Sequence, residues 1–150
     1  MSETISATMQ GGCQCGRVRF TATLENFDAY LCHCRMCQRA TGGVAAAFVN
    51  MRKDQRTWDS EPDWYASSSF ARRPFCRECG TPLGFEYPDA ARCDLTVGSF
   101  DDPSAFVPTS HFGVEARHDA WLDTRGLPEM RCDECPSLVA RWATVGQEEK

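Results

Sequence analysis

The sequence has no long hydrophobic run: no stretch approaches the roughly 18 apolar residues that a membrane-spanning helix needs. Residues 1–12 are polar and small, and they lack the basic and apolar regions of a secretory leader. Basic residues are not in excess, because the formal charge is -5 at pH 7, whereas binding a phosphate backbone usually requires a basic face. We therefore expect a cytoplasmic protein that binds neither membranes nor nucleic acids.

Several common catalytic motifs are also missing. The chain has no serine–histidine–acid order, no phosphate-binding loop and no dinucleotide fingerprint. It has three histidines, none with a paired carboxylate in the sequence that would tune it as a general base. We expect His33 to pack or donate a hydrogen bond rather than ligate a metal, and His111 and His118 to be structural. These absences leave the cysteines as the main carriers of chemistry.

Cysteine is abundant, with 10 residues in a chain of 150. In a reducing compartment, closely spaced cysteines indicate metal ligands before they indicate a disulfide framework. Thiolates one or two residues apart can reach a single tetrahedral ion at roughly 2.3 Å. Seven of the cysteines form three such groups: Cys13-x-Cys15, Cys32-x-Cys34-x-x-Cys37 and Cys76-x-x-Cys79.

The first and third groups supply four thiolates between them, the number that closes a structural zinc site. Gly16 and Gly80 follow these pairs, and we expect each to take a conformation disfavoured for residues with a Cβ. Such a zinc would pin the N-terminal strand to a later hairpin, and loss of any ligand would destabilise the fold. Iron stays open as an alternative metal, although the chain has no cluster-type cysteine run.

The group formed by Cys32, Cys34 and Cys37 has three sulfurs, which leave a zinc ion one further position. Water, a substrate thiol or another side chain could fill that position. A bound thiol would lose its proton, and its sulfur could attack a nearby carbonyl. The alternative is that Cys93 or a histidine closes this site and makes it structural.

The remaining cysteines have less specific patterns. Cys93 alternates within a strand-like run, which is typical of a small buried hydrophobe. For Cys132-x-x-Cys135 we favour a plain disulfide or a free dithiol. A third zinc shared with Cys93 and a histidine, a bridge between subunits, and a dithiol switch are the alternatives.

Five arginines lie near the proposed ligands, and two interpretations are open for them. They could offset the negative charge of the zinc–thiolate centres, or they could hold an anionic substrate. These residues are Arg35, Arg39, Arg72, Arg73 and Arg77.

The pattern of short apolar segments and turn residues predicts a mainly β protein. We expect strands over 17–23, 30–32, 44–50, 82–87 and 93–97. A short helix is expected over 35–40, and a second over 136–145, capped by Ser137 and packed against a sheet. The expected organisation is a flexible N-terminus at 1–10, a single zinc-binding domain at 11–145 and a flexible tail at 146–150.

With these motifs the chain resembles the family of glutathione-dependent formaldehyde-activating enzymes, which also includes the centromere-protein-V proteins. The similarity rests on residues 11–20, 32–42 and 75–83, which contain the three cysteine groups and their flanks. Later fragments agree as well: Val97 to Pro103, His111, Trp121 and Gly126-Leu127-Pro128.

The resemblance implies a β-tent fold of packed antiparallel sheets with two zinc ions. One is a closed zinc on Cys13, Cys15, Cys76 and Cys79, and the other is a reactive zinc on the catalytic residues Cys32, Cys34 and Cys37. The implied activity is that of a carbon–sulfur lyase, which adds glutathione to formaldehyde to give S-hydroxymethylglutathione, or the reverse. In that mechanism the second zinc holds the thiolate beside the aldehyde carbon. The alternative function is a non-catalytic binding module with two structural zincs.

Overall fold

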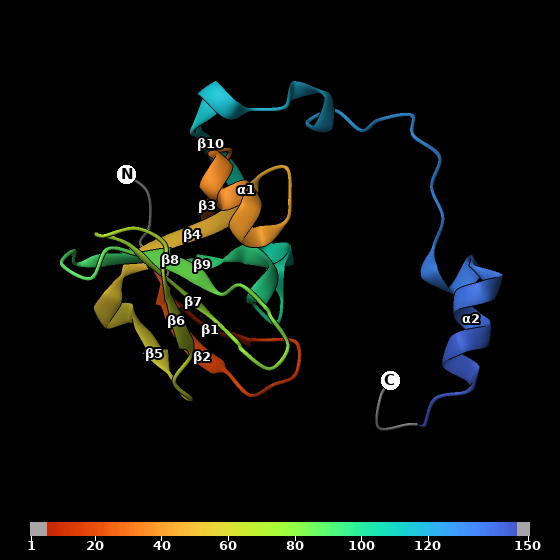
Figure 1. The fold of residues 1–150 in the computed structure, drawn as a ribbon, viewed down its shortest axis with the longest axis horizontal. Helices are drawn as coiled ribbons and strands as arrows, with labels where there is room; N and C mark the ends of the chain where they lie inside the picture. The colour runs from red at the N-terminus through yellow and green to blue at the C-terminus, as the bar shows by residue number, and fades with distance from the viewer. Residues whose placement is uncertain (1–5, 147–150) are drawn as a thin grey trace. The chain divides into compact units, whose positions relative to one another are not determined.

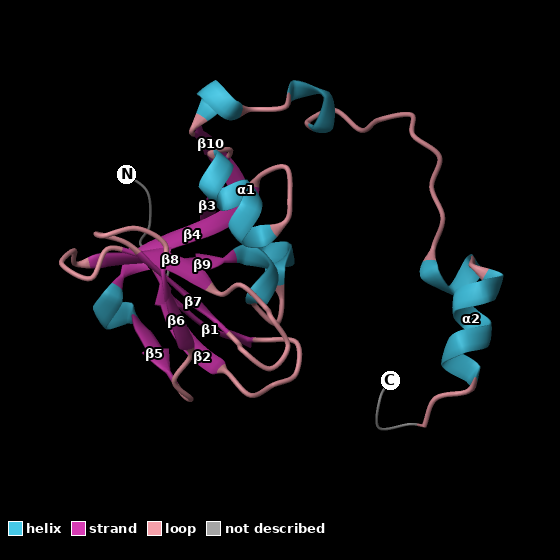
Figure 2. Ribbon diagram, in the orientation of Figure 1, coloured by secondary structure: helices cyan, strands magenta, loops and turns pink. Residues whose placement is uncertain are grey.

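The computed structural model describes residues 6–146, and the chain divides into two units, Met1–His118 and Asp119–Lys150. Strands dominate the first unit, as Figures 1 and 2 show, and they form two sheets. The predicted mainly β class is therefore confirmed.

The smaller sheet has three strands in the order β1-β2-β5 and the larger has seven in the order β10-β3-β4-β9-β8-β7-β6. The strands of the smaller sheet are β1 (Ala7–Gly12), β2 (Arg19–Leu24) and β5 (Arg56–Trp58). Those of the larger sheet are β3 (Asp28–Cys32), β4 (Ala46–Arg52), β6 (Asp63–Ala66), β7 (Arg72–Phe75), β8 (Gly84–Glu86), β9 (Arg92–Thr96) and β10 (Val107–Phe112). The helices are α1 (Arg35–Thr41), α2 (Pro136–Ala143) and the 3-10 turns η1 (Lys53–Gln55), η2 (Val97–Ser99), η3 (Pro103–Ala105), η4 (Val114–Ala116), η5 (Asp119–Trp121) and η6 (Cys132–Glu134).

Neighbouring strands pair antiparallel, as expected, with one exception. β10 runs parallel to β3, and its register shifts between Pro108 and Ser110. Proline has no backbone N–H to donate to a ladder, so an irregularity beside Pro108 at the edge of the sheet is expected. This edge strand brings His111 and Phe112 level with Leu31 and Cys32.

The main core lies between the sheets and follows from residue alternation. In β2 every second side chain is buried, which places Phe20, Ala22 and Leu24 on the inner face. Phe20 makes edge-to-face contacts with Trp58 and Phe100, at centroid distances of 5.8 and 5.1 Å. Burial of a ring of this size contributes about 2–3 kcal/mol, so β2 is firmly attached to the core.

Helix α1 confirms the first predicted helix and lies against β4 (Figure 1). It begins after Cys34, whose Sγ accepts a hydrogen bond from the backbone N–H of Cys37 at 3.3 Å. The buried Gln38 amide donates to the carbonyl oxygens of His33, at 2.7 Å, and Ala116, at 3.1 Å. These bonds fix the helix against the segment before it and the segment after β10.

The second unit contains η5, η6 and α2, and it shows one correction. Ser137 lies inside α2 rather than at its cap: Cys135 is the N-cap residue and Pro136 takes the first helical position. A proline fits there because its missing N–H would have no partner at a helix start. The expected packing of this helix against a sheet stays a prediction. Across residues 6–146, none of the helices has the length and apolar character required to cross a membrane.

The ends of the chain differ in part from the expected organisation. Residues 7–10 belong to β1, although we expected residues 1–10 to be flexible. Residues 1–5 and 147–150 lie outside the described part of the chain. The single domain over 11–145 stays a prediction.

Candidate metal centres and substrate cavities

The structure brings together the two cysteine pairs that the sequence predicts to share one metal ion. The Sγ atoms of all four residues lie within 4.8 Å of one another, and the set is Cys13, Cys15, Cys76 and Cys79. The Sγ of Cys15 lies 3.6 Å from that of Cys13 and 3.7 Å from that of Cys76. A tetrahedral zinc with bonds of about 2.3 Å sets its sulfurs roughly 3.8 Å apart, so the set fits this ion.

Two glycine turns bring these sulfurs together. Gly16 has a φ of 83° and donates its N–H to the Cys13 carbonyl at 3.1 Å. Gly80 has a φ of 80° and donates to the Cys76 carbonyl at 2.7 Å. A side chain would strain the backbone at both positions, which confirms the predicted role of the two glycines.

Two members of the four-cysteine set are buried in the core, whereas Cys79 is half-buried and Cys15 is exposed, and polar contacts hold the set together. Cys13 and Cys76 are 6% and 0% exposed and belong to the main hydrophobic cluster. The backbone N–H of Gln14 donates to Thr81 Oγ1 at 3.0 Å, which ties the two turns together. Burial opposes ionisation of Cys79, but hydrogen bonds from the hydroxyl and backbone of Thr81 outweigh it and lower the pKa of this thiol to about 5.

Arg17 lies beside this set and was not among the arginines expected there from the sequence. The Arg17 Nε donates to the Cys76 Sγ at 3.4 Å, and the same guanidinium is paired with Asp63. The sequence could have indicated this contact, because Arg17 directly follows the Cys15-Gly16 turn. This cation offsets part of the charge of a four-thiolate site.

The second set meets where β3 leads into α1. Cys32 ends β3, Cys34 caps α1 and Cys37 lies in its first turn, and their Sγ atoms all lie within 4.8 Å of one another. The Sγ atoms of Cys32 and Cys34 are 3.5 Å apart. Among residues 6–118, no other cysteine, histidine or carboxylate offers a ligand atom to this group. The set therefore fits a metal ion with three protein ligands.

Cys93 does not close the second site. It lies in β9, is 1% exposed and packs in the main core, away from the small cluster that holds Cys32 and Cys37. Burial raises the pKa of its thiol to about 11. The prediction of a small buried hydrophobe is confirmed, and the alternative of Cys93 as the fourth ligand is wrong.

The histidines near the second site pair with each other. His33 Nε2 lies 2.8 Å from His111 Nδ1, and the two ring centroids are 5.0 Å apart. The predicted hydrogen-bonding role of His33 is confirmed, and the structural role of His111, which also lines a cavity beside the second set, stays a prediction. This pair ties the start of α1 to β10.

Arg73, one of the five arginines expected near the metal ligands, contacts one of the three cysteines of the second set. Its Nη2 donates to the Cys37 Sγ at 3.5 Å, and its guanidinium lies over the Phe85 ring, 4.8 Å from the centroid. A hydrogen bond from Cys32, with that from Arg73, lowers the pKa of Cys37 to about 5 despite its burial. The same bond to the Cys37 thiolate raises the pKa of Cys32. Of these two thiols, the site thus favours the ionised form of Cys37.

The other predicted arginines are used differently. Arg72 pairs with the buried Glu86 at 2.9 Å and lies over Trp64, and Arg77 pairs with Glu78 at 3.5 Å. The interpretation that arginines offset the thiolate charge therefore holds for Arg73 and not for these two. Arg35 pairs with Gln38, and Arg39 lines a cavity.

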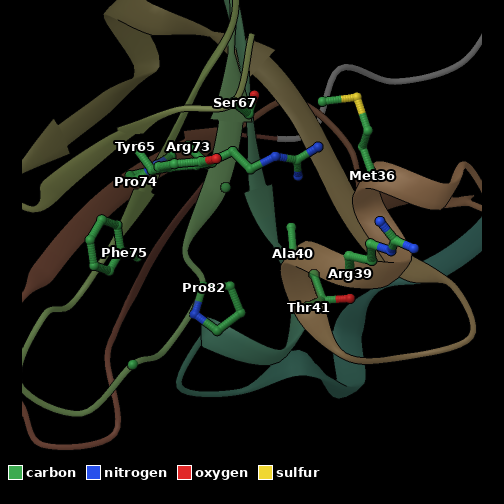
Figure 3. Close-up of a pocket in the computed structure, with 12 residues that line it drawn as sticks. Met36, Arg39, Ala40, Thr41, Tyr65, Ser67, Arg73, Pro74, Phe75 and Pro82 are labelled. Atoms are coloured by element: carbon green, nitrogen blue, oxygen red, sulfur yellow. The ribbon is translucent and has the colours of Figure 1, made fainter.

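Two cavities lie next to each other near the second cysteine set and share Met36, Ser67 and Arg73, and one of them is lined by the cysteines themselves. The first, of about 580 Å³, has two cationic side chains at its wall, and Figure 3 shows that Arg39 and Arg73 reach it from α1 and β7. The second, of about 490 Å³, is lined by the three cysteines and by a group of aromatic residues. The two neighbouring cavities thus differ in the chemistry of their walls.

Asp94 lines the second cavity and was not anticipated from the sequence. Burial raises the pKa of its carboxyl to about 6, against the opposing hydrogen bonds from Asn50, whose Nδ2 lies at 3.0 Å, and Tyr30. A carboxyl that titrates near neutrality can both donate and accept a proton under physiological conditions.

The last cysteine pair stands in the second unit. Cys132 and Cys135 are free thiols in the described structure, which agrees with the free dithiol and not with the disulfide, the two forms that we expected. A hydrogen bond with the Ser137 hydroxyl, whose Oγ lies 3.5 Å from its Sγ, lowers the pKa of Cys135. The dithiol switch stays a prediction.

Comparisons with known proteins agree with this geometry. A Schizosaccharomyces pombe protein, named as an uncharacterized lyase, is 36% identical over 78 residues, which are 52% of this chain and 57% of that relative. This chain thus matches little more than half the length of that relative. The crystal structure of a Rhodobacter sphaeroides protein superposes with a TM-score of 0.55 at 25% identity, covering 67% of this chain and 98% of that one. The family model described as glutathione-dependent formaldehyde-activating enzyme matches residues 8–116, so the chain belongs to this family.

Proposed function

We propose that the protein is a zinc-dependent carbon–sulfur lyase, which joins a thiol to a small aldehyde and catalyses the reverse cleavage. Glutathione and formaldehyde are the pair suggested by the family name. The observation that carries the proposal is the set of Cys32, Cys34 and Cys37, which supplies three ligands at the wall of a cavity. A site made to hold metal for structure alone would be closed by a fourth protein ligand.

The two cysteine sets then have separate roles. Zinc held by Cys32, Cys34 and Cys37 would offer a fourth position at which a substrate thiol loses its proton. Hydrogen bonds from Cys32 and Arg73 lower the pKa of Cys37 and favour its thiolate, and the Arg73 guanidinium reduces the net negative charge of the centre. The core set of Cys13, Cys15, Cys76 and Cys79 would hold the structural zinc.

The first cavity suits the thiol partner. Glutathione carries two carboxylates, and the guanidinium groups of Arg39 and Arg73 line this cavity. Arginine binds carboxylates through paired N–H donors, which fixes orientation as well as position. A glutathione molecule held there would direct its sulfur toward the cysteine set, because Arg73 also contacts Cys37.

Asp94 is suited to the proton transfer. When the thiolate sulfur attacks the aldehyde carbon, the carbon–sulfur bond forms and the carbonyl π electrons move to oxygen, which then needs a proton. The Asp94 carboxylic acid would donate that proton, and its carboxylate would take it back in the cleavage direction. The hydrogen bond from Asn50 holds the carboxyl group in place.

Exchange NMR of glutathione and formaldehyde with a trace of zinc-replete protein tests this function. Interconversion should be faster than in a protein-free control and should fall to the control rate with Cys37→Ser. Cys93→Ala is the matched control, since Cys93 is a buried cysteine outside both metal sets, and it should retain the rate. No acceleration by the native protein would contradict this reaction and favour a binding module with two structural zincs.

A further inference from the structure

The second cavity has an aromatic wall that a one-carbon aldehyde does not need. Tyr30 and Phe48 contribute two rings whose centroids are 5.7 Å apart. Phe85 and Tyr87 make an edge-to-face pair at 5.2 Å, and Phe70 continues the row 6.0 Å from Tyr87. All five rings line the same cavity of about 490 Å³, which is a volume typical of sites for small organic ligands, about 300–1,000 Å³.

Some of these apolar side chains are unusually exposed. Phe70 is 65% exposed and Phe112, from β10, is 67% exposed, and both line the cavity. Large apolar residues gathered around one hollow, rather than scattered singly, mark a surface that binds an apolar group. Their burial by a ligand would be favourable, and aromatic partners would add ring–ring contacts.

The position of this wall relative to the cysteines restricts which part of a substrate can bind against it. Cys32, Cys34 and Cys37 line the same cavity, so a group seated against the rings lies next to the reacting sulfur. The carboxylates of a glutathione-like thiol are matched by the arginines of the other cavity. The aromatic wall therefore suits the group that comes from the aldehyde and is attached to the carbon of the carbon–sulfur bond.

We infer that the preferred substrates are thiol adducts of aromatic aldehydes, with the aryl group held against Phe70, Phe85, Tyr87 and Phe112. This inference rests on the proposed lyase function and names the substrate class of the same site. Arg73 supports the wall by stacking on Phe85 and joins it to the thiol cavity. The polar side chain of Asp94 at the same wall serves the reacting oxygen rather than the ring.

A binding experiment tests the inference without turnover. S-benzylglutathione and S-methylglutathione are stable thioethers that differ in the aryl group, and each is titrated into zinc-replete protein by calorimetry. The benzyl compound should bind at least about tenfold more tightly, as expected for an added group in an apolar pocket. Equal affinity for the two compounds would overturn the inference.

Two exposed positions allow the wall to be altered with little risk to the fold. Phe70→Ala and Phe112→Ala should each reduce the preference for the benzyl compound by about three- to tenfold and leave binding of the methyl compound unchanged. Val107→Ala is the matched control, because Val107 is 58% exposed on the same strand as Phe112 but does not line this cavity. A preference unchanged in both phenylalanine variants would also overturn the inference.

Measurement of exchange rates with two aldehydes tests the aromatic specificity separately from the proposed lyase function. With glutathione as thiol, the native protein should accelerate exchange of benzaldehyde more than that of formaldehyde. Acceleration of formaldehyde exchange alone would overturn the aromatic specificity and keep the lyase function. Acceleration of neither exchange, together with a lost benzyl preference, would overturn both.

Discussion

Four cysteines of this chain meet at the edge of the main core, where Cys13 and Cys76 are buried and Cys15 is exposed, and three meet in a smaller cluster at the wall of a cavity. Cys76 is fully buried and its set is complete, whereas Cys34 is half-buried and its set lacks a fourth protein ligand among residues 6–118. The same ligand type thus serves two purposes. A complete thiolate set in the core stabilises the fold, and an incomplete set at a cavity leaves a position for chemistry.

Replacement of a core ligand should give the largest effect. Cys76→Ser removes one of four ligands from a site whose metal-binding energy is folding energy, so we expect loss of the cooperative thermal transition. Circular dichroism on heating and zinc content per chain measure this. A variant that melts within a few degrees of the native protein would contradict the structural role of the core set.

Replacement of a cavity ligand should separate activity from stability. We expect Cys37→Ser to lower turnover by more than about 100-fold, because changes even one shell beyond a metal ligand cost 10–100-fold. The thermal transition should remain, with loss of one zinc per chain. If Cys37→Ser unfolded the protein as Cys76→Ser does, the two sets would share one role.

The sequence was most informative where structure is local. Metal ligands one or two residues apart, the glycine turns beside them and the helix after Cys34 are all decided by neighbours in the chain, and each was predicted. Five strands were missed: β1, β5, β6, β7 and β10. Strands β5 and β6 are short and have no fully buried side chain, β7 carries Arg72, Arg73 and a proline, and the side chains of β10 are exposed. Such strands lack the alternating apolar pattern by which strands are identified.

The substrate cavities could not be predicted for a different reason. Their walls combine residues from β3, β4, β8, β9 and β10, which pair only after the sheet has formed. The contact between Arg73 and Cys37 spans 36 positions, and that between His33 and His111 spans 78. No local pattern encodes these distances, so Asp94 and the aromatic wall emerged only from the fold.

Removal of the arginine beside the second cysteine set should have a smaller effect, confined to the zinc affinity of that set. Arg73→Gln removes the donor to Cys37, so the second zinc should bind about tenfold more weakly while the core zinc is unaffected. Competition with a chromophoric chelator measures both affinities. The matched control is Arg72→Gln, since Arg72 is adjacent but pairs with Glu86. Equal weakening in both variants would remove the specific role of Arg73.

The pH dependence of stability provides a further test at the cavity wall. The folded pKa of Asp94, about 6, lies above the ordinary value of 3.8, so folding favours the protonated form. Its contribution to stability is present below about pH 3.8 and is lost as the pH rises through about 6. Asp94→Asn should therefore gain stability relative to the native protein over this window, on the order of 2 kcal/mol. Urea unfolding at several pH values measures the difference, and a pH-independent difference would contradict the raised pKa.

X-ray absorption at the zinc edge tests the contrast between the two sets most directly. The zinc-replete protein should show, on average over two ions, a sulfur shell with a minor oxygen or nitrogen contribution, because one site is closed and the other is open. Addition of glutathione should convert this to an all-sulfur shell, and Cys37→Ser should abolish the change. An all-sulfur shell before any thiol is added, unchanged by glutathione, would show that both sites are closed and would contradict the account.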